Sequence, residues 1–175
     1  KVMNLTGITE KEEVYLKHFY DSLTIVKAID LNKIETLCDI GTGAGFPGLV
    51  LKIVFPKIKI TLIDSLNKRI KFLNDVIEKL KLEKIETVHA RMEEYSKNNI
   101  EKFDVVTARA VANIEKLLNF TMHLVNENGV FVAMKGNIDE EVTDEIIQKI
   151  NKKYKILSIN KFLLPVENSN RSLVI

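Results

Sequence analysis

Cysteine, tryptophan and long apolar runs are scarce or missing in this sequence of 175 residues. The single cysteine, Cys38, excludes an internal disulfide, and the first residues lack the pattern of a secretory signal. No apolar run approaches the roughly 18 residues that a membrane-spanning helix requires. We therefore expect a protein of the reducing cytoplasm that has no membrane partner.

An excess of one charge is also missing. The 26 Lys and Arg residues and 24 Asp and Glu residues give a formal net charge of +2, below that of a dedicated nucleic-acid-binding module. Arginine is rare among the basic residues. We expect arginine to be kept where a planar, forked guanidinium is required. The arginines are Arg69, Arg91, Arg109 and Arg171.

The composition is that of a folded protein. Hydrophobic residues make up 46% of the chain, enough to bury a core, which excludes a disordered or collagen-like protein. The length fits one domain over residues 1–175. We expect a helical lead-in over residues 1–34, in which Thr9 and Glu12 match a capping box, and a Rossmann-like core over residues 35–175.

Strand-like and helix-like segments alternate from Glu35 onward, which predicts an α/β fold with a parallel sheet and helices on both faces. Asn128 and Gly129 indicate a turn. The last two strands follow one another without a helix, so they should be antiparallel. We expect strands at residues 35–40, 58–63, 85–89, 103–108, 130–134, 154–164 and 171–175, and helices at 9–29, 47–55, 66–80, 92–95, 114–125 and 138–150.

Four of the seven glycines fall between the first strand and the next helix, at Gly41, Gly43, Gly45 and Gly48. Such glycines let a ligand approach the main chain closely. A dinucleotide fingerprint would need a third glycine where Phe46 stands, so a dehydrogenase is disfavoured. The acid-x-G-x-G-x-G pattern resembles the loop of class I S-adenosylmethionine-dependent methyltransferases.

Two carboxylates accompany this loop. Asp39 could face the ammonium and sulfonium charges of that cofactor, and Asp64 ends the second strand, where a carboxylate can accept hydrogen bonds from ribose hydroxyls. The competing interpretation is that both acids only cap the following turns. Three scattered histidines and one cysteine give no metal-ligand spacing, so we expect no metal.

Longer segments are similar to those of the bacterial small-subunit ribosomal RNA (guanine-N7) methyltransferases, the glucose-inhibited division protein B family. The resemblance covers essentially the whole chain, and its FPG and DSLxKR elements are more specific than the glycine loop. The matching segments are residues 4–8 (NLTGI), 18–23 (HFYDSL), 41–48 (GTGAGFPG), 64–69 (DSLNKR), 89–93 (HARME), 108–110 (ARA) and 134–136 (MKG).

The resemblance implies methyl transfer from S-adenosylmethionine to N7 of a guanine in 16S rRNA of the small ribosomal subunit. It implies a mostly parallel seven-stranded sheet with an antiparallel C-terminal strand. It also implies cofactor binding by Gly41, Phe46, Met92, Glu93 and Arg109, in addition to Asp39, Gly43, Gly45 and Asp64. Met92 could equally be a core residue, whereas Arg109 follows an apolar strand and would be costly to bury unpaired.

Guanine N7 carries a lone pair and no proton, so its methylation needs positioning and no general base. Arg109 and Lys135 are the candidates for positioning the substrate, and His18, Asn113 and Arg171 are further candidates for binding it. Cys38 precedes Asp39 inside the first strand, which favours a core residue over a nucleophile. The segment after the fourth strand lacks the NPPY or DPPY pattern of exocyclic-amine methyltransferases.

Two other functions stay open at this point: a methyltransferase acting on a protein or a small molecule, and a non-catalytic adenosylmethionine-binding regulator. We expect a monomer. The chain starts at Lys1 and stops at Ile175 within an apolar run, which suggests trimmed ends. Members of the family have further helix before the NLTGI segment and a basic tail after the last strand. We therefore expect the charge of +2 to understate the RNA-binding surface of the intact protein.

Overall fold

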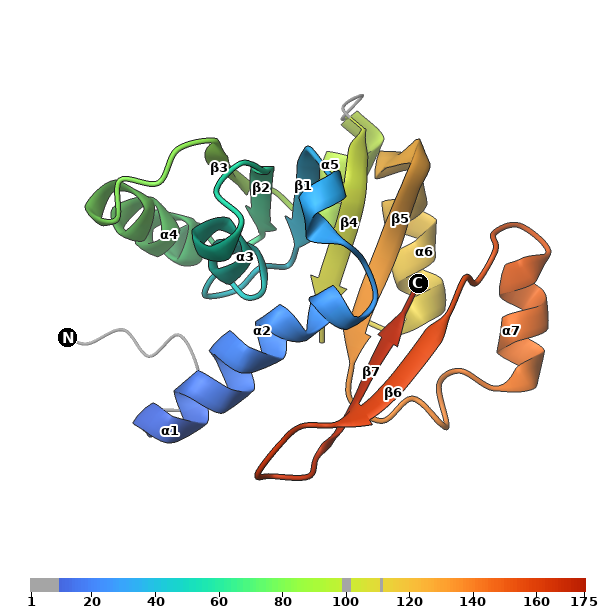
Figure 1. Ribbon diagram of the computed structural model, residues 1–175. Helices are drawn as coiled ribbons and strands as arrows, with labels where there is room; N and C mark the ends of the chain where they lie inside the picture. The colour runs from blue at the N-terminus through green and yellow to red at the C-terminus, as the bar shows by residue number, and fades with distance from the viewer. Residues whose placement is uncertain (1–9, 99–101, 111) are drawn as a thin grey trace.

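The computed structural model describes residues 10–98, 102–110 and 112–175. Its centre is a seven-stranded sheet in the order β3-β2-β1-β4-β5-β7-β6 (Figure 1). The strands are β1 (Thr36–Ile40), β2 (Lys59–Asp64), β3 (Ile85–His89), β4 (Phe103–Arg109), β5 (Val125–Lys135), β6 (Ile159–Leu163) and β7 (Asn170–Val174).

The strand directions confirm the predicted fold class. β1 pairs in parallel with β2 and β4, β3 continues the parallel run beside β2, and β5 does so beside β4. β7 is antiparallel to both β5 and β6, because the short connection from β6 to β7 holds no crossover helix. The chain reverses its direction of winding between β1 and β4, and ligands of open α/β sheets bind at such a point.

Helices cover both faces of the sheet. α3 (Gly48–Val54) and α4 (Asn67–Lys79) pack on one face, and α5 (Met92–Asn98), α6 (Ile114–Thr121) and α7 (Asp144–Asn151) pack on the other. Short 3-10 turns η3 (Leu31–Lys33) and η4 (Met122–Leu124) precede β1 and β5. Alternate residues of the central strands face opposite cores, so Val105 and Val106 belong to different apolar clusters.

The N-terminal helix comprises four consecutive helical elements at residues 11–27. They are α1 (Lys11–Val14), the π-helical turn η1 (Tyr15–Tyr20), α2 (Asp21–Leu23) and the 3-10 turn η2 (Thr24–Lys27). It lies beside the lower ends of the central strands in Figure 1, where β4 ends. The helix ends two residues earlier than expected, and the capping-box residue Thr9 lies outside the described residues.

Several sequence-based boundaries were wrong. The strand expected at residues 154–164 is β6 (Ile159–Leu163), and the helix expected at residues 114–125 is α6 (Ile114–Thr121). Pro47 is the N-cap of α3 and not its first residue. β5 already begins at Val125, and the expected turn at Asn128 and Gly129 is part of the strand near a register shift against β4. The last predicted helix begins only at Asp144. Its N-cap is Thr143, whose side chain accepts a hydrogen bond from the Ile146 amide.

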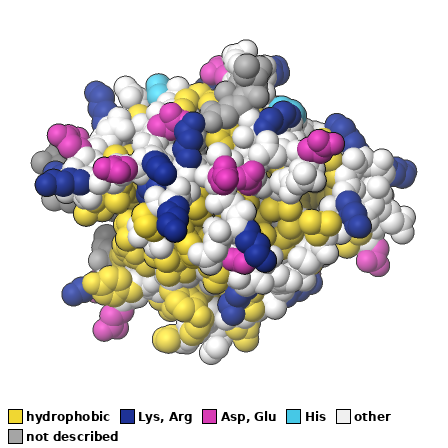
Figure 2. Space-filling view, turned by 45° about the horizontal axis from the view of Figure 1, so that its top comes forward, with side chains coloured by type: hydrophobic (Ala, Val, Ile, Leu, Met, Phe, Trp, Pro, Cys, Tyr) yellow, Lys and Arg dark blue, Asp and Glu magenta, His cyan; other side chains and the backbone are white. Residues whose placement is uncertain are grey.

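The surface carries both charges. Figure 2 shows Lys and Arg side chains interspersed with Asp and Glu over the visible face. Across the described ranges, no helix has the length and apolar character to span a membrane. The described part of the chain likewise holds no group of three or more His, Cys, Asp or Glu side chains suited to a metal ion.

Candidate functional site

A cavity of about 680 Å³ lies at the carboxyl ends of the parallel strands. Its walls come from the segments that follow β1, β2, β3 and β4, together with one residue of the N-terminal helix. This is the position at which the reversal of winding between β1 and β4 predicts a ligand. Of the predicted site residues, the cavity is lined by His18, Gly41, Gly43, Phe46, Asp64, Met92, Glu93 and Arg109.

Two glycines of the loop, Gly43 and Gly45, have different roles. Gly43 has φ +61°, and a Cβ built on it would meet nothing within 4 Å, so its main chain is open to a ligand. Gly45 has φ +97°, and a Cβ there would lie 2.8 Å from the Cβ of Leu49. Gly45 therefore allows the loop to pack on α3 and does not line the cavity, and its contact with the cofactor stays a prediction.

Asp39 holds the loop from inside the protein. Its Oδ2 accepts hydrogen bonds from Thr42 Oγ1 at 2.6 Å and from the Gly48 amide at 2.8 Å. Burial raises the pKa of Asp39 to about 6, while these two hydrogen bonds act in the opposite direction. Asp39 does not line the cavity, so its observed contacts are those of the competing, turn-capping interpretation.

Asp64 lines the cavity at the end of β2. Its Oδ2 accepts a hydrogen bond from the Gly43 amide at 2.9 Å, and its Oδ1 accepts one from the Leu66 amide at 2.9 Å. Arg69 Nη1 lies 3.1 Å from Oδ2 in an ion pair that sequence reasoning missed. The carboxylate thereby joins the glycine loop to the second strand, in the position expected for a ribose contact.

The residues fit S-adenosylmethionine. Asp39 Oδ1 is a buried acceptor without a hydrogen-bond partner among the described residues, beneath a loop whose Gly43 is open to a ligand. A buried acceptor of this kind favours a donor such as an ammonium group, reached directly or through water. Met92 and Glu93 line the cavity after β3, and Met92 also packs on the core. A contact of Met92 with the cofactor stays a prediction.

His18, Phe46 and Arg109 form a cluster at one end of the cavity. The His18 ring stacks on the Phe46 ring with centroids 4.7 Å apart, and the Arg109 guanidinium carbon lies 5.4 Å from the Phe46 centroid. Burial and the neighbouring Arg109 charge lower the pKa of His18. His18 is therefore neutral at neutral pH, and the stable cation of the cluster is Arg109.

A second cavity of about 270 Å³ adjoins the first and shares His18, Arg109 and Ala110 with it. Lys135 and Arg171, both expected to contact the substrate, line this second cavity. Asn113 lines neither cavity. Its Oδ1 accepts a hydrogen bond from the Lys116 amide at 3.0 Å and caps α6.

The Lys135 ammonium group already has hydrogen-bond partners within the protein. Its Nζ lies 2.9 Å from Glu141 Oε1 and donates to the Ala112 carbonyl, and the side chain is only 10% exposed. Glu141 also accepts a hydrogen bond from the Ile114 amide. The observed role of Lys135 is therefore to fix the segment between β4 and α6, and a contact with substrate would have to replace one of these bonds.

Five contributors escaped prediction as site residues: Lys17, Asp21, Arg69, Arg91 and Glu141. The scarcity of arginine was the available signal, because every arginine of the chain lines one of the two cavities. Arg69, Arg91 and Arg109 line the first cavity, and Arg109 and Arg171 line the second.

Comparison with known proteins agrees with this geometry. A family model described as GidB: rRNA small subunit methyltransferase G matches residues 1–174. Curated relatives named ribosomal RNA small subunit methyltransferase G include one from Bacillus licheniformis, 49% identical over 99% of this chain and 74% of the relative. The Bacillus subtilis protein of the same name is 46% identical, with the same two coverages.

Solved structures agree on the fold. A SAM-dependent methyltransferase from Aquifex aeolicus matches with a TM-score of 0.66 and 17% identity, over 94% of this chain and 93% of that one. TYW2 of P. horikoshii, solved in complex with MeSAdo, matches with a TM-score of 0.70 and 13% identity, over 98% and 65% of the two chains. The sheet, the glycine loop and these matches together establish that the chain belongs to the rRNA small subunit methyltransferase G family.

Proposed function

We propose that this protein transfers a methyl group from S-adenosylmethionine to N7 of a guanine in 16S rRNA of the small ribosomal subunit. It does so as a monomer in the cytoplasm, with residues 1–175 acting as one domain. The observation that carries the proposal is the pair of adjoining cavities that share His18, Arg109 and Ala110. One cavity has the loop and carboxylates suited to the cofactor, and the other has the cations suited to RNA.

The cofactor supplies an electrophilic methyl group on a sulfonium. Gly41 and Gly43 bring main chain close to it, and the Asp64 carboxylate accepts hydrogen bonds from its ribose. Met92 and Glu93, which line the cavity after β3, would contact the adenine. Asp39 holds the loop through Thr42 and the Gly48 amide, and its second oxygen has no hydrogen-bond partner among the described residues.

The guanine acceptor needs only to be aligned with the methyl group. Because guanine N7 has no proton to lose, the reaction requires no base, and the rate depends on placing N7 in line with the methyl group. Arginine and lysine donate to guanine O6 and to phosphate, and a loop guanine of RNA can be splayed out of its stack. We assign this binding to Arg109 and Arg171, with His18 beside the transfer path.

The test uses labelled adenosylmethionine and 30S subunits that lack native 7-methylguanosine. The wild-type protein should label the RNA, and digestion should release 7-methylguanosine as the product nucleoside. Label on ribosomal protein would indicate a protein acceptor instead. Cofactor binding without any transfer would indicate a regulator.

Matched aspartate variants test the cofactor site. Asp64→Asn removes the carboxylate inside the cavity, whereas Asp75→Asn removes one on the exposed face of α4. Loss of a hydrogen bond to a charged group should weaken adenosylmethionine binding about 10-fold or more for Asp64→Asn, measured by calorimetry. Asp75→Asn should bind like the wild type, and equal affinities of the two variants would contradict the assignment.

A further inference from the structure

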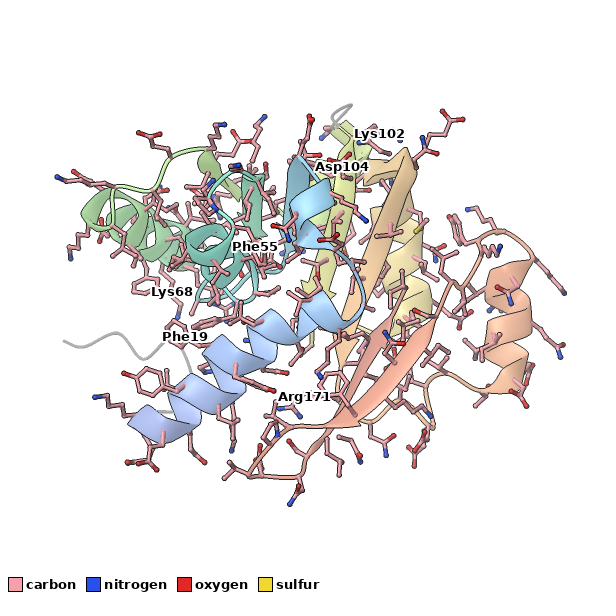
Figure 3. All side chains as sticks on the ribbon, viewed as in Figure 1. Phe19, Phe55, Lys68, Lys102, Asp104 and Arg171 are labelled. Carbon is pink, nitrogen blue, oxygen red and sulfur yellow. The ribbon has the colours of Figure 1, made fainter. Side chains whose placement is uncertain are left out.

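Asp21 lies between two arginines that come from distant parts of the chain. Its Oδ1 accepts a hydrogen bond from Arg171 Nε at 3.0 Å, and its Oδ2 lies 3.4 Å from Arg109 Nη1. Arg109 ends β4, and Arg171 stands on β7, where Figure 3 shows it close to the N-terminal helix. One carboxylate therefore joins the N-terminal helix to two strands of the sheet.

Both arginines form an ion pair with this carboxylate. The Asp21 side chain is 8% exposed and that of Arg109 is 16% exposed, so water screens the pair weakly. Among the described residues, no other carboxylate forms an ion pair with Arg109 or Arg171. Burial lowers the pKa of Arg109 and the Arg171 charge adds to that effect, whereas the charges of Asp21 and Asp39 oppose it.

The same helical turn holds Arg109 through two further contacts. Arg109 Nη1 donates to the Lys17 carbonyl at 3.2 Å, and Nη2 lies 3.5 Å from His18 Nδ1. This turn is π-helical, and the Asp21 amide donates to the carbonyls of Leu16 and His18. The Lys17 carbonyl is thus left for the arginine, in agreement with the frequent occurrence of π-helical turns at functional sites.

We propose that Asp21 is a positioning residue for methyl transfer, which holds the Arg109 guanidinium at the junction of the two cavities. The inference rests on the proposed function. Asp21 acts through Arg109, because its Oδ2 faces that guanidinium, and a fixed guanidinium orients the acceptor base relative to the methyl group. Displacement of such a group by about 1 Å can lower a rate about 100-fold.

A double-mutant cycle separates positioning from simple stabilisation. The proteins are wild type, Asp21→Asn, Arg109→Ala and the double variant, assayed for kcat and for KM of adenosylmethionine on 30S subunits lacking 7-methylguanosine. Rates are expressed per cofactor-binding protein, and melting temperatures are recorded. Glu12→Gln, which neutralises an exposed carboxylate on the same N-terminal helix, is the control.

We expect Asp21→Asn to lower kcat about 100-fold in the wild-type background, and to lower it no more than about twofold when Arg109 is already alanine. Glu12→Gln should retain the wild-type kcat. If Asp21→Asn does not fold, Asp21→Glu carries the same test, because it keeps the charge but moves the oxygens by one methylene. Its kcat loss should again vanish in the Arg109→Ala background.

Three outcomes would overturn the inference. The first is an unchanged kcat in Asp21→Asn. The second is a double variant whose loss of kcat equals the product of the two single losses. Either result would mean that Asp21 does not act through Arg109. The third is the absence of transfer by the wild-type protein, which alone would also remove the proposed function. The wild-type rate thus tells the two failures apart.

Discussion

At the scale of single residues, Asp39 shows how burial and hydrogen bonding oppose each other. The side chain is completely buried at the end of β1, yet one of its oxygens fixes both Thr42 and the start of α3. Burial dominates and raises the pKa of Asp39 from 3.8 to about 6. The folded protein therefore binds a proton at this site over a pH range in which the unfolded chain has lost it.

The raised pKa of Asp39 makes the folded protein less stable as the pH rises. Since the folded pKa is the higher one, stability from this group is fully present below pH 3.8 and is lost as the pH rises through 6. Between pH 4.5 and pH 7 the loss amounts to about 2 kcal/mol of unfolding free energy. Urea unfolding at both pH values should show this decrease in the wild type and not in Asp39→Asn. Parallel decreases in both proteins would refute the assigned pKa.

At the scale of secondary-structure elements, Asn113 caps the N-terminus of α6 and lines neither cavity. Asn113 accepts a hydrogen bond from the Lys116 amide, and the buried residues Ile114 and Leu117 follow on the inner face of the helix. Loss of such a cap typically lowers stability by about 1 kcal/mol, and serine can replace asparagine at this position.

We therefore expect Asn113→Ala to lower the free energy of unfolding by about 1 kcal/mol and Asn113→Ser to retain it. Urea denaturation of the three proteins measures the difference. Methyl transfer by the Ser variant decides between cap and ligand. A low rate in a fully stable Asn113→Ser protein would restore the substrate role that the sequence had suggested.

The elements that sequence could predict are those specified by local pattern. The glycine loop and Asp64 lie at the strand ends where the alternation of strands and helices predicted them. A few neighbouring residues are enough to specify each of these positions. The predicted helix at residues 138–150 was wrong at its start. Ile138 is buried and fits the helical spacing, but it belongs to the loop that Glu141 fixes to Lys135 and to the Ile114 amide. Those contacts are tertiary, and no local pattern reports them.

At the scale of the whole molecule, the small net charge conceals an uneven distribution of arginine. All four arginines line the two cavities, whereas lysines also occupy the groove at the amino ends of β1, β2 and β3, opposite the site. Scarcity of arginine could therefore have predicted Arg69 and Arg91. It could not have predicted Asp21, whose partner Arg171 is 150 positions away.

Beyond the second cavity, we expect the exposed Arg91 at the first cavity to contact RNA phosphate as well. Each phosphate contact contributes about 0.7 to the slope of log affinity against log salt for single-stranded nucleic acid. Arg91→Gln, at the cofactor cavity, should reduce the slope for 30S binding by about that amount. Lys57→Gln, in the opposite groove, should leave the slope unchanged, as measured by filter binding from low to high salt. Equal slopes for all three proteins would place the RNA elsewhere.

The position of β7 has a consequence for synthesis on the ribosome. β7 is the last strand along the chain but lies inside the sheet, between β5 and β6. While β6 emerges, the strand that must join it to β5 has not yet been made, so at most five of these seven strands can pair before β7 is synthesised. The second cavity needs both Asp21 and Arg171. A nascent chain can therefore form the glycine loop and the cofactor side before β7 is made, whereas the acceptor side closes only once β7 has joined β5 and β6.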